Sequence, residues 1–118
     1  MKVIGVCILT QDVIKLTEFY KAVLKTDSIG DATHMEMNTD GAAIAIYNPG
    51  NVPRAEICNI QLGLEVDDVD SEFERLSSLG MTVTQQPETY PWGRRAMQIR
   101  DPDGNYINLS CPAKESAK

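Results

Sequence analysis

His34 is the only histidine in the chain, and Glu36 follows it two positions later. Alternate residues of a strand share a face, so the two side chains would be neighbours if this run is a strand. An imidazole beside a carboxylate is an acid–base pair, which makes His34 a candidate general base or ligand contact. The alternative is a solvated strand face with alternating polar residues. A single histidine excludes a histidine-based metal cluster within one chain.

Trp92 is the only tryptophan, and it stands between a proline and a glycine in an expected loop. A loop tryptophan can act as a stacking surface for a ligand, or it can cap the edge of the core or form a dimer contact. Arg94 and Arg95 follow it and can pair with ligand anions or with surface carboxylates. Tyr47 and Tyr90 are candidate aromatic walls of the same pocket.

Composition and missing motifs exclude several functions. The 118 residues carry a formal net charge of -6, which disfavours binding to phosphate backbones, so no nucleic-acid partner is expected. No nucleophile-elbow motif or phosphate-binding glycine loop is present. No apolar run approaches the ~20 residues of a membrane span, and no signal peptide is recognised.

The cysteines indicate a reducing environment. They are an odd number without a C-x-x-C pair, so we expect free thiols and a cytoplasmic location. Cys7 and Cys58 lie in apolar runs and are expected in the core, whereas Cys111, at a strand end, is expected to be more exposed.

The same order of elements is predicted twice along the chain. Strand-like runs at 3–9 and 57–66 are each followed by a helical pattern capped by Asp12 and by Asp67 or Asp68. Asp-Gly in 38–41 and Pro-Asp-Gly in 101–105 predict tight turns. Further strands are expected at 33–37, 42–47, 81–84, 95–100 and 106–111.

This order predicts an α+β fold of two tandem βαβββ modules. The modules span about 1–50 and 56–112 of a single domain, 1–112, with a linker at 48–54 and a flexible tail at 113–118. Neither half can cover its sheet alone, so we expect cupped mixed sheets around a cleft that would hold a ligand.

Several motifs together resemble the glyoxalase/bleomycin resistance protein/dioxygenase superfamily, also called vicinal oxygen chelate proteins. They are Glu18-Phe19-Tyr20-Lys21, Val66-Asp67-Asp68-Val69-Asp70, Pro91-Trp92-Gly93 and Asp101-Pro102-Asp103-Gly104-Asn105-Tyr106-Ile107. The resemblance covers residues 3–111. It implies a cupped sheet from each half, a pocket lined by aromatic groups and a homodimer.

The resemblance also implies four metal-ligand positions, which fall on Gly5, Ala45, Gln61 and Asn108. The first two have no ligating side chain, and two neutral amides make a poor transition-metal site. No metal and no cofactor are therefore expected. Without a metal, Gln61 and Asn108 can orient a polar organic ligand, or they can bond to each other or to buried water.

The expected function is metal-free binding of a small organic ligand, as in bleomycin-resistance-like proteins. The candidate ligand-binding residues are Trp92, Gln61, Asn108, Tyr47, Arg95 and His34. One alternative is a lyase, isomerase or dioxygenase with an unusual or metal-free site, for example at His34 and Glu36. Another is a regulatory module that serves only dimerisation. The scaffold alone does not choose between them.

Overall fold

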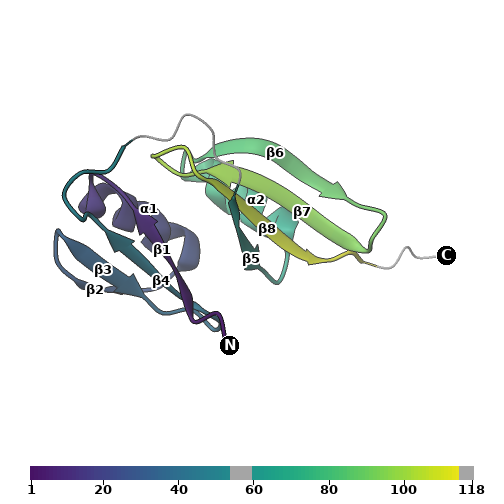
Figure 1. Ribbon diagram of the computed structural model, residues 1–118. Coiled ribbons are helices and arrows are strands. Elements are labelled where there is room, and N and C mark those ends of the chain that lie inside the picture. Colours follow the sequence, from purple (N-terminus) through teal and green to yellow (C-terminus); the bar gives the residue numbers. More distant parts are fainter. Residues whose placement is uncertain (54–59, 115–118) are drawn as a thin grey trace. The chain divides into compact units, whose positions relative to one another are not determined.

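The computed structural model describes residues 1–53 and 60–114, which belong to two compact units, Met1–Glu56 and Ile57–Lys118 (Figure 1). Each unit contains one helix and one four-stranded mixed sheet. The predicted α+β fold of two tandem modules is confirmed. None of the helices in the described ranges is long and apolar enough to cross a membrane.

The first unit has the order β1 (Gly5–Leu9), α1 (Val13–Leu24), β2 (Ser28–Gly30), β3 (His34–Met37) and β4 (Ala43–Tyr47). Its sheet is arranged β1-β4-β3-β2, with β1 parallel to β4 and the other pairs antiparallel. Strand β2 was not predicted, because three residues ending in a glycine carry no readable period.

Helix α1 begins where the sequence predicts it. The Asp12 carboxylate accepts a hydrogen bond from the Lys15 N–H at 3.1 Å, which satisfies one free donor of the first turn. The buried side chains of α1 include Leu16 and Tyr20, and they recur with helical spacing. The helix packs on β3 and β4, whose Met37, Ile44 and Ile46 are also buried.

The second unit repeats the pattern. It contains β5 (Gln61–Glu65), α2 (Val69–Ser78), β6 (Thr82–Thr89), β7 (Arg94–Arg100) and β8 (Tyr106–Pro112), in the sheet order β5-β8-β7-β6. Asp68, not Asp67, caps α2 by accepting from the Asp70 N–H at 3.0 Å. The buried apolar residues of this unit are Val69, Leu76, Met97, Ile99, Ile107, Leu109 and Cys111.

Some predicted boundaries need correction. Strand β6 continues to Thr89, beyond the expected 81–84, and register shifts between Gln85 and Glu88 accommodate Pro87 inside it. The Ala113 N–H donates to the Gly93 carbonyl at 2.9 Å at the end of β8. Residues 54–59, including the predicted strand start and Cys58, and the tail residues 115–118 lie outside the described ranges.

Cys7 was expected in the core and Cys111 at a more exposed position, and the structure shows the opposite. Cys7 is exposed and Cys111 is buried. Strand alternation explains both: Cys7 faces away from the helix-covered side of its sheet, whereas Cys111 shares the buried face of β8 with Ile107 and Leu109. An apolar run does not reveal which of its alternate residues face the helix.

Candidate functional site

The open face of the second sheet, opposite the face that packs on α2, carries a pocket of about 300 Å³. Strand alternation creates it: Met97, Ile99 and Leu109 are buried beneath the helix, so the residues between them face away. The pocket is lined by Gln61, Gln85, Tyr90, Trp92, Arg94, Ala96, Gln98, Asn108 and Ser110.

An aromatic stack forms one wall of the pocket. The rings of Tyr90 and Trp92 lie 4.7 Å apart at an interplanar angle of 14°. The tight turn between β6 and β7 holds them, with the Tyr90 N–H donating to the Arg94 carbonyl at 2.7 Å and Gly93 at a φ of 84°. Trp92 is 71% exposed, so an apolar surface remains available for a ligand.

Amide side chains cover the floor of the pocket. Gln98 Nε2 donates to Gln61 Oε1 at 3.0 Å, and the Thr84 hydroxyl donates to Gln98 Oε1 at 2.7 Å. Asn108 lies directly across from Gln98 in the β7–β8 pairing. Its Oδ1 atom is buried and has no hydrogen-bond partner among the described residues. A buried acceptor of this kind is unusual in a folded protein.

The positive charge of Arg94 is neutralised within its own sheet. Its guanidinium is ion-paired with Glu65 and donates to the Ser110 hydroxyl at 2.8 Å. The cation among the lining residues is therefore already paired, and the other polar groups of the lining are uncharged.

Arg95 does not line this pocket, although it was predicted as a ligand contact. As the neighbour of Arg94 in β7, it lies on the opposite face, where its Nε and Nη2 atoms each donate to Asp70 of α2 at 2.8 Å. The hydrogen bond from Arg95 lowers the pKa of Asp70, and the same bond raises the pKa of Arg95. This ion pair connects α2 to β7.

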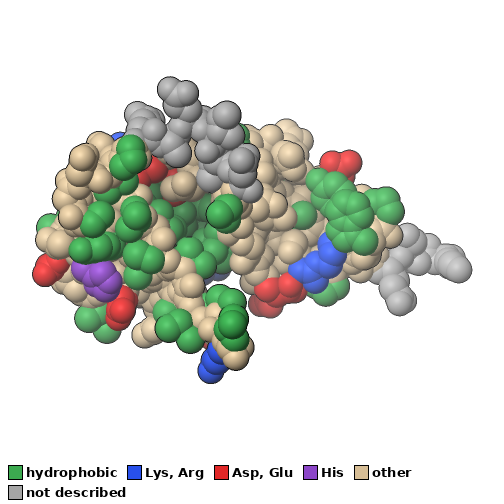
Figure 2. Space-filling model, in the orientation of Figure 1, with side chains coloured by type: hydrophobic (Ala, Val, Ile, Leu, Met, Phe, Trp, Pro, Cys, Tyr) green, Lys and Arg blue, Asp and Glu red, His purple; other side chains and the backbone are tan. Residues whose placement is uncertain are grey.

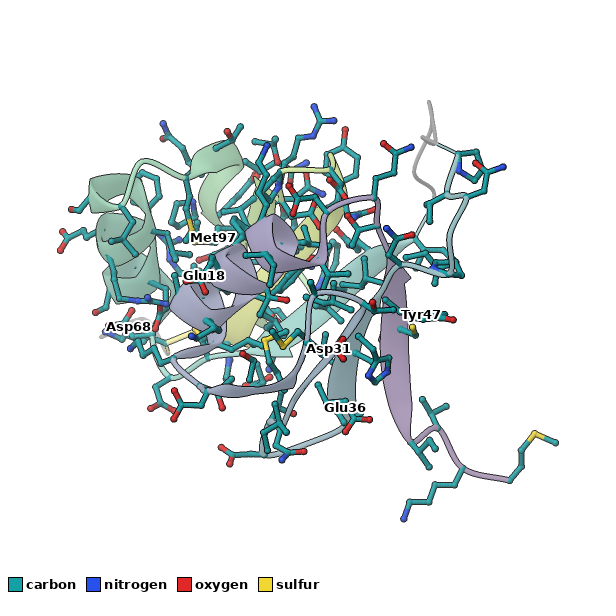
Figure 3. All side chains as sticks on the ribbon, turned by 90° about the vertical axis from the view of Figure 1, so that its left-hand side faces the viewer. Glu18, Asp31, Glu36, Tyr47, Asp68 and Met97 are labelled. Carbon is teal, nitrogen blue, oxygen red and sulfur yellow. The ribbon has the colours of Figure 1, made fainter. Side chains whose placement is uncertain are left out.

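His34 and Tyr47 lie in the first unit, on the face of its sheet that points away from α1. They are direct partners in the β3–β4 pairing, and their rings meet edge to face at 5.7 Å. Glu36 lies on the same face, as predicted, and Figure 3 shows Asp31, Glu36 and Tyr47 at neighbouring positions. Figure 2 shows both hydrophobic (green) and acidic (red) side chains on the surface around the histidine (purple).

Asp31 holds the turn that leads into β3. Its carboxylate accepts from the backbone N–H groups of Thr33 at 2.8 Å and His34 at 3.1 Å. These two bonds, the one from Thr33 first, lower the pKa of Asp31. Asp31 is thus a turn-forming carboxylate, and it positions the backbone of His34.

The structure brings together Gln61, Asn108 and Trp92, and it adds Gln85 and Gln98, which the sequence did not single out. The available signal was the alternation Arg94, Ala96, Gln98 along one strand face. That signal became readable only when the register placed Gln98 beside Asn108.

The residues at the family's metal positions do not fit a metal ion. A Cβ atom at Gly5 would lie 2.6 Å from the Ala43 carbonyl oxygen, so the tight β1–β4 pairing leaves no room for a ligating side chain. The side chain of Ala45 has no atom that can ligate a metal, and Gln61 Oε1 already accepts a hydrogen bond from Gln98. Within residues 1–53 and 60–114, no group of three or more His, Cys, Asp or Glu side chains gathers in a metal-binding arrangement.

A second depression, of about 530 Å³, lies at the C-terminal end of α1. It is an open surface between charged side chains, including the ion pair of Lys21 with Glu18 at 3.7 Å. It lacks the aromatic and amide groups of the pocket on the second sheet.

Comparison with known proteins gives one family. Residues 3–109 match the family model described as Glyoxalase/Bleomycin resistance protein/Dioxygenase superfamily. An uncharacterized protein of Mycobacterium bovis is 36% identical over 56 residues, which is 48% of this chain and 37% of that protein. The chain thus matches only about a third of the length of its curated relatives.

Two solved structures illustrate the shared fold. A glyoxalase/bleomycin resistance protein/dioxygenase from Nocardioides has a TM-score of 0.80 at 18% identity, covering 98% of this chain and 87% of that one. A lactoylglutathione lyase from Agrobacterium tumefaciens has a TM-score of 0.75 at 18% identity, covering 94% of both chains. At these identities the likeness concerns the fold alone.

Proposed function

Because this chain belongs to the glyoxalase/bleomycin resistance protein/dioxygenase superfamily, we propose that it binds a small organic molecule without a catalytic metal, in the pocket on the second sheet. The lining of that pocket carries the proposal. The Tyr90–Trp92 stack stands beside the uncharged amide side chains of the pocket lining, which are those of Gln61, Gln85, Gln98 and Asn108. An apolar wall with a few convergent polar groups is typical of small-molecule sites.

The loss of the metal positions supports binding without metal chemistry. A ligating side chain is absent at Gly5 and Ala45, and the close approach of Ala43 prevents one from being accommodated at Gly5. The remaining amides are better suited to hydrogen bonding than to holding a divalent ion.

The test compares two single variants in binding assays. A library of small, planar, uncharged molecules is screened by thermal shift, and hits are measured by calorimetry. We expect Trp92→Ala to weaken binding by about tenfold, as lost aromatic stacking would. Tyr47→Ala, which removes an aromatic ring from the other sheet, is the matched control and should leave binding unchanged. The opposite pattern would transfer the site to the first sheet and overturn the proposal.

A second candidate function is acid–base catalysis on the first sheet, as in a lyase, isomerase or dioxygenase of the same superfamily. The observation that favours it is the shared face of His34, Glu36 and Tyr47. Stoichiometric divalent metal in purified protein that disappears in His34→Ala would favour the metal-dependent form of this alternative. Metal content below about a tenth of an ion per chain, unchanged by the substitution, would count against its metal-dependent form.

Family membership also supports two further proposals, a homodimer and a single functional domain over 1–112. A cytoplasmic location is proposed from the odd number of cysteines without a C-x-x-C pair. Native mass spectrometry tests the homodimer directly. A monomeric mass at micromolar concentration would refute the homodimer without affecting the pocket on the second sheet.

A further inference from the structure

We infer that Tyr90 and Ala113 are positioning residues for Trp92, the stacking wall of the proposed function on which this inference rests. Tyr90 orients the indole ring, and the backbone N–H of Ala113 holds the turn that carries it. Ala113 does not line the pocket. Ligand affinity therefore depends on a residue at the end of β8 that a ligand need not touch.

The indole ring of Trp92 has little support from the protein core. Trp92 is 71% exposed, so core packing does little to select one rotamer of its side chain. The Tyr90 ring lies 4.7 Å from the indole at an interplanar angle of 14°, which is a stacked contact. This contact favours indole orientations parallel to the Tyr90 ring. A wall restricted in this way loses less side-chain freedom when a ligand stacks on it.

Two hydrogen bonds within the β6–β7 hairpin hold the backbone of Trp92. The Gly93 N–H donates to the Tyr90 carbonyl at 3.1 Å, which closes a β-turn over residues 90–93. The Tyr90 N–H donates to the Arg94 carbonyl at 2.7 Å. Pro91 suits the second position of such a turn because its φ is fixed by the ring. These bonds set the path of the turn relative to the two strands that it joins.

A third hydrogen bond reaches the turn from outside the hairpin. The Ala113 N–H donates to the Gly93 carbonyl at 2.9 Å. Pro112, which pairs with Arg94, has no N–H, so Ala113 supplies the donor with which the end of β8 reaches the turn. Because Ala113 is not a lining residue, we expect its N–H to affect a ligand through the turn.

The first measurement needs no ligand. Trp92 is the only tryptophan, so subtracting the near-ultraviolet circular dichroism spectrum of Trp92→Ala isolates the tryptophan band. We expect a weaker band in Tyr90→Ala and in Ala113→Pro, which lacks the N–H donor. Tyr90→Phe keeps a stacked ring and Ala113→Ser keeps the donor, so both should retain the band. Far-ultraviolet spectra and melting temperatures verify that each variant is folded.

The second measurement is calorimetric binding of 2-naphthol, an uncharged planar molecule, or of the tightest hit from the planar library. Tyr90→Ala should weaken binding by about two- to tenfold, the effect of ordering one more side chain on binding. Ala113→Pro should weaken binding by about two- to fivefold, because only chains with the turn in place are competent to bind. Ala113→Ser should bind like the parent chain. In the Trp92→Ala background, Ala113→Pro should have no further effect.

Two kinds of failure can be told apart. Parental affinity in Ala113→Pro, or an equal loss of affinity with and without Trp92, overturns the inference and leaves the proposed function standing. An unchanged tryptophan band in Tyr90→Ala or in Ala113→Pro overturns the positioning role of that residue. If no probe binds the parent chain, or if Trp92→Ala binds as tightly as the parent, the proposed function fails as well.

Discussion

Glycines in the first strand of each unit have opposite surroundings, so the same substitution should have opposite effects. A Cβ at Gly5 would lie 2.6 Å from the Ala43 carbonyl oxygen, a backbone atom that cannot rotate away. A Cβ at Gly63 would meet nothing within 4 Å. Neither glycine has a positive φ, so alanine is compatible with the backbone at both positions.

The size of the stability difference follows from the one term that the two variants do not share. Replacing glycine by alanine reduces the freedom of the unfolded chain, which stabilises by about 0.4–1 kcal/mol wherever the new residue fits. That gain is common to Gly5→Ala and Gly63→Ala, so it cancels between them. What remains is the strain of forcing β1 away from β4, about 1–3 kcal/mol for an overpacked site.

Urea denaturation followed by circular dichroism and Trp92 fluorescence measures the difference. With an m-value of about 1–3 kcal/mol/M, Gly5→Ala should unfold at a urea midpoint lower than that of Gly63→Ala by on the order of 1 M. Gly63→Ala should be at least as stable as the parent chain. A Gly5→Ala midpoint equal to or above that of Gly63→Ala would refute the claim that a backbone contact closes the first metal position.

Three further predictions concern stability. The pKa of Asp70 is lowered below its usual 3.8 in the folded chain, so its pairing with Arg95 contributes stability above that pH and the contribution is lost as the pH falls through the folded pKa. Asp70→Asn should therefore flatten the fall in melting temperature below about pH 4. An unchanged acid profile would contradict this. Leu109→Ala, at a residue 1% exposed, should lower the free energy of unfolding in urea by about 2–5 kcal/mol, and a loss well below about 2 kcal/mol would contradict its core role. Asp12→Ala removes the cap of α1 and should destabilise by about 1 kcal/mol, with Asp12→Asn as the control that keeps an acceptor.

Local features of the fold could be predicted because their causes lie within a few residues. Asp12 and Asp68 cap helices whose apolar spacing is visible in the sequence. The turn before β8 was predicted for the same reason: Asp101 accepts from the N–H groups of Asp103 and Asn105, both at 2.9 Å. Both modules follow from such signals, repeated in the same order.

The sequence by itself thus determined the tandem modules, their helices and the identity of several pocket residues. The tertiary structure alone decided that Arg94 faces the pocket while Arg95 binds Asp70, and that Gln98 connects Thr84 to Gln61. It alone also revealed why Gly5 admits no side chain. The physical reason is strand register: which residues meet across a sheet, and on which face, depends on pairings between distant segments, and a shift of one residue would reverse every face.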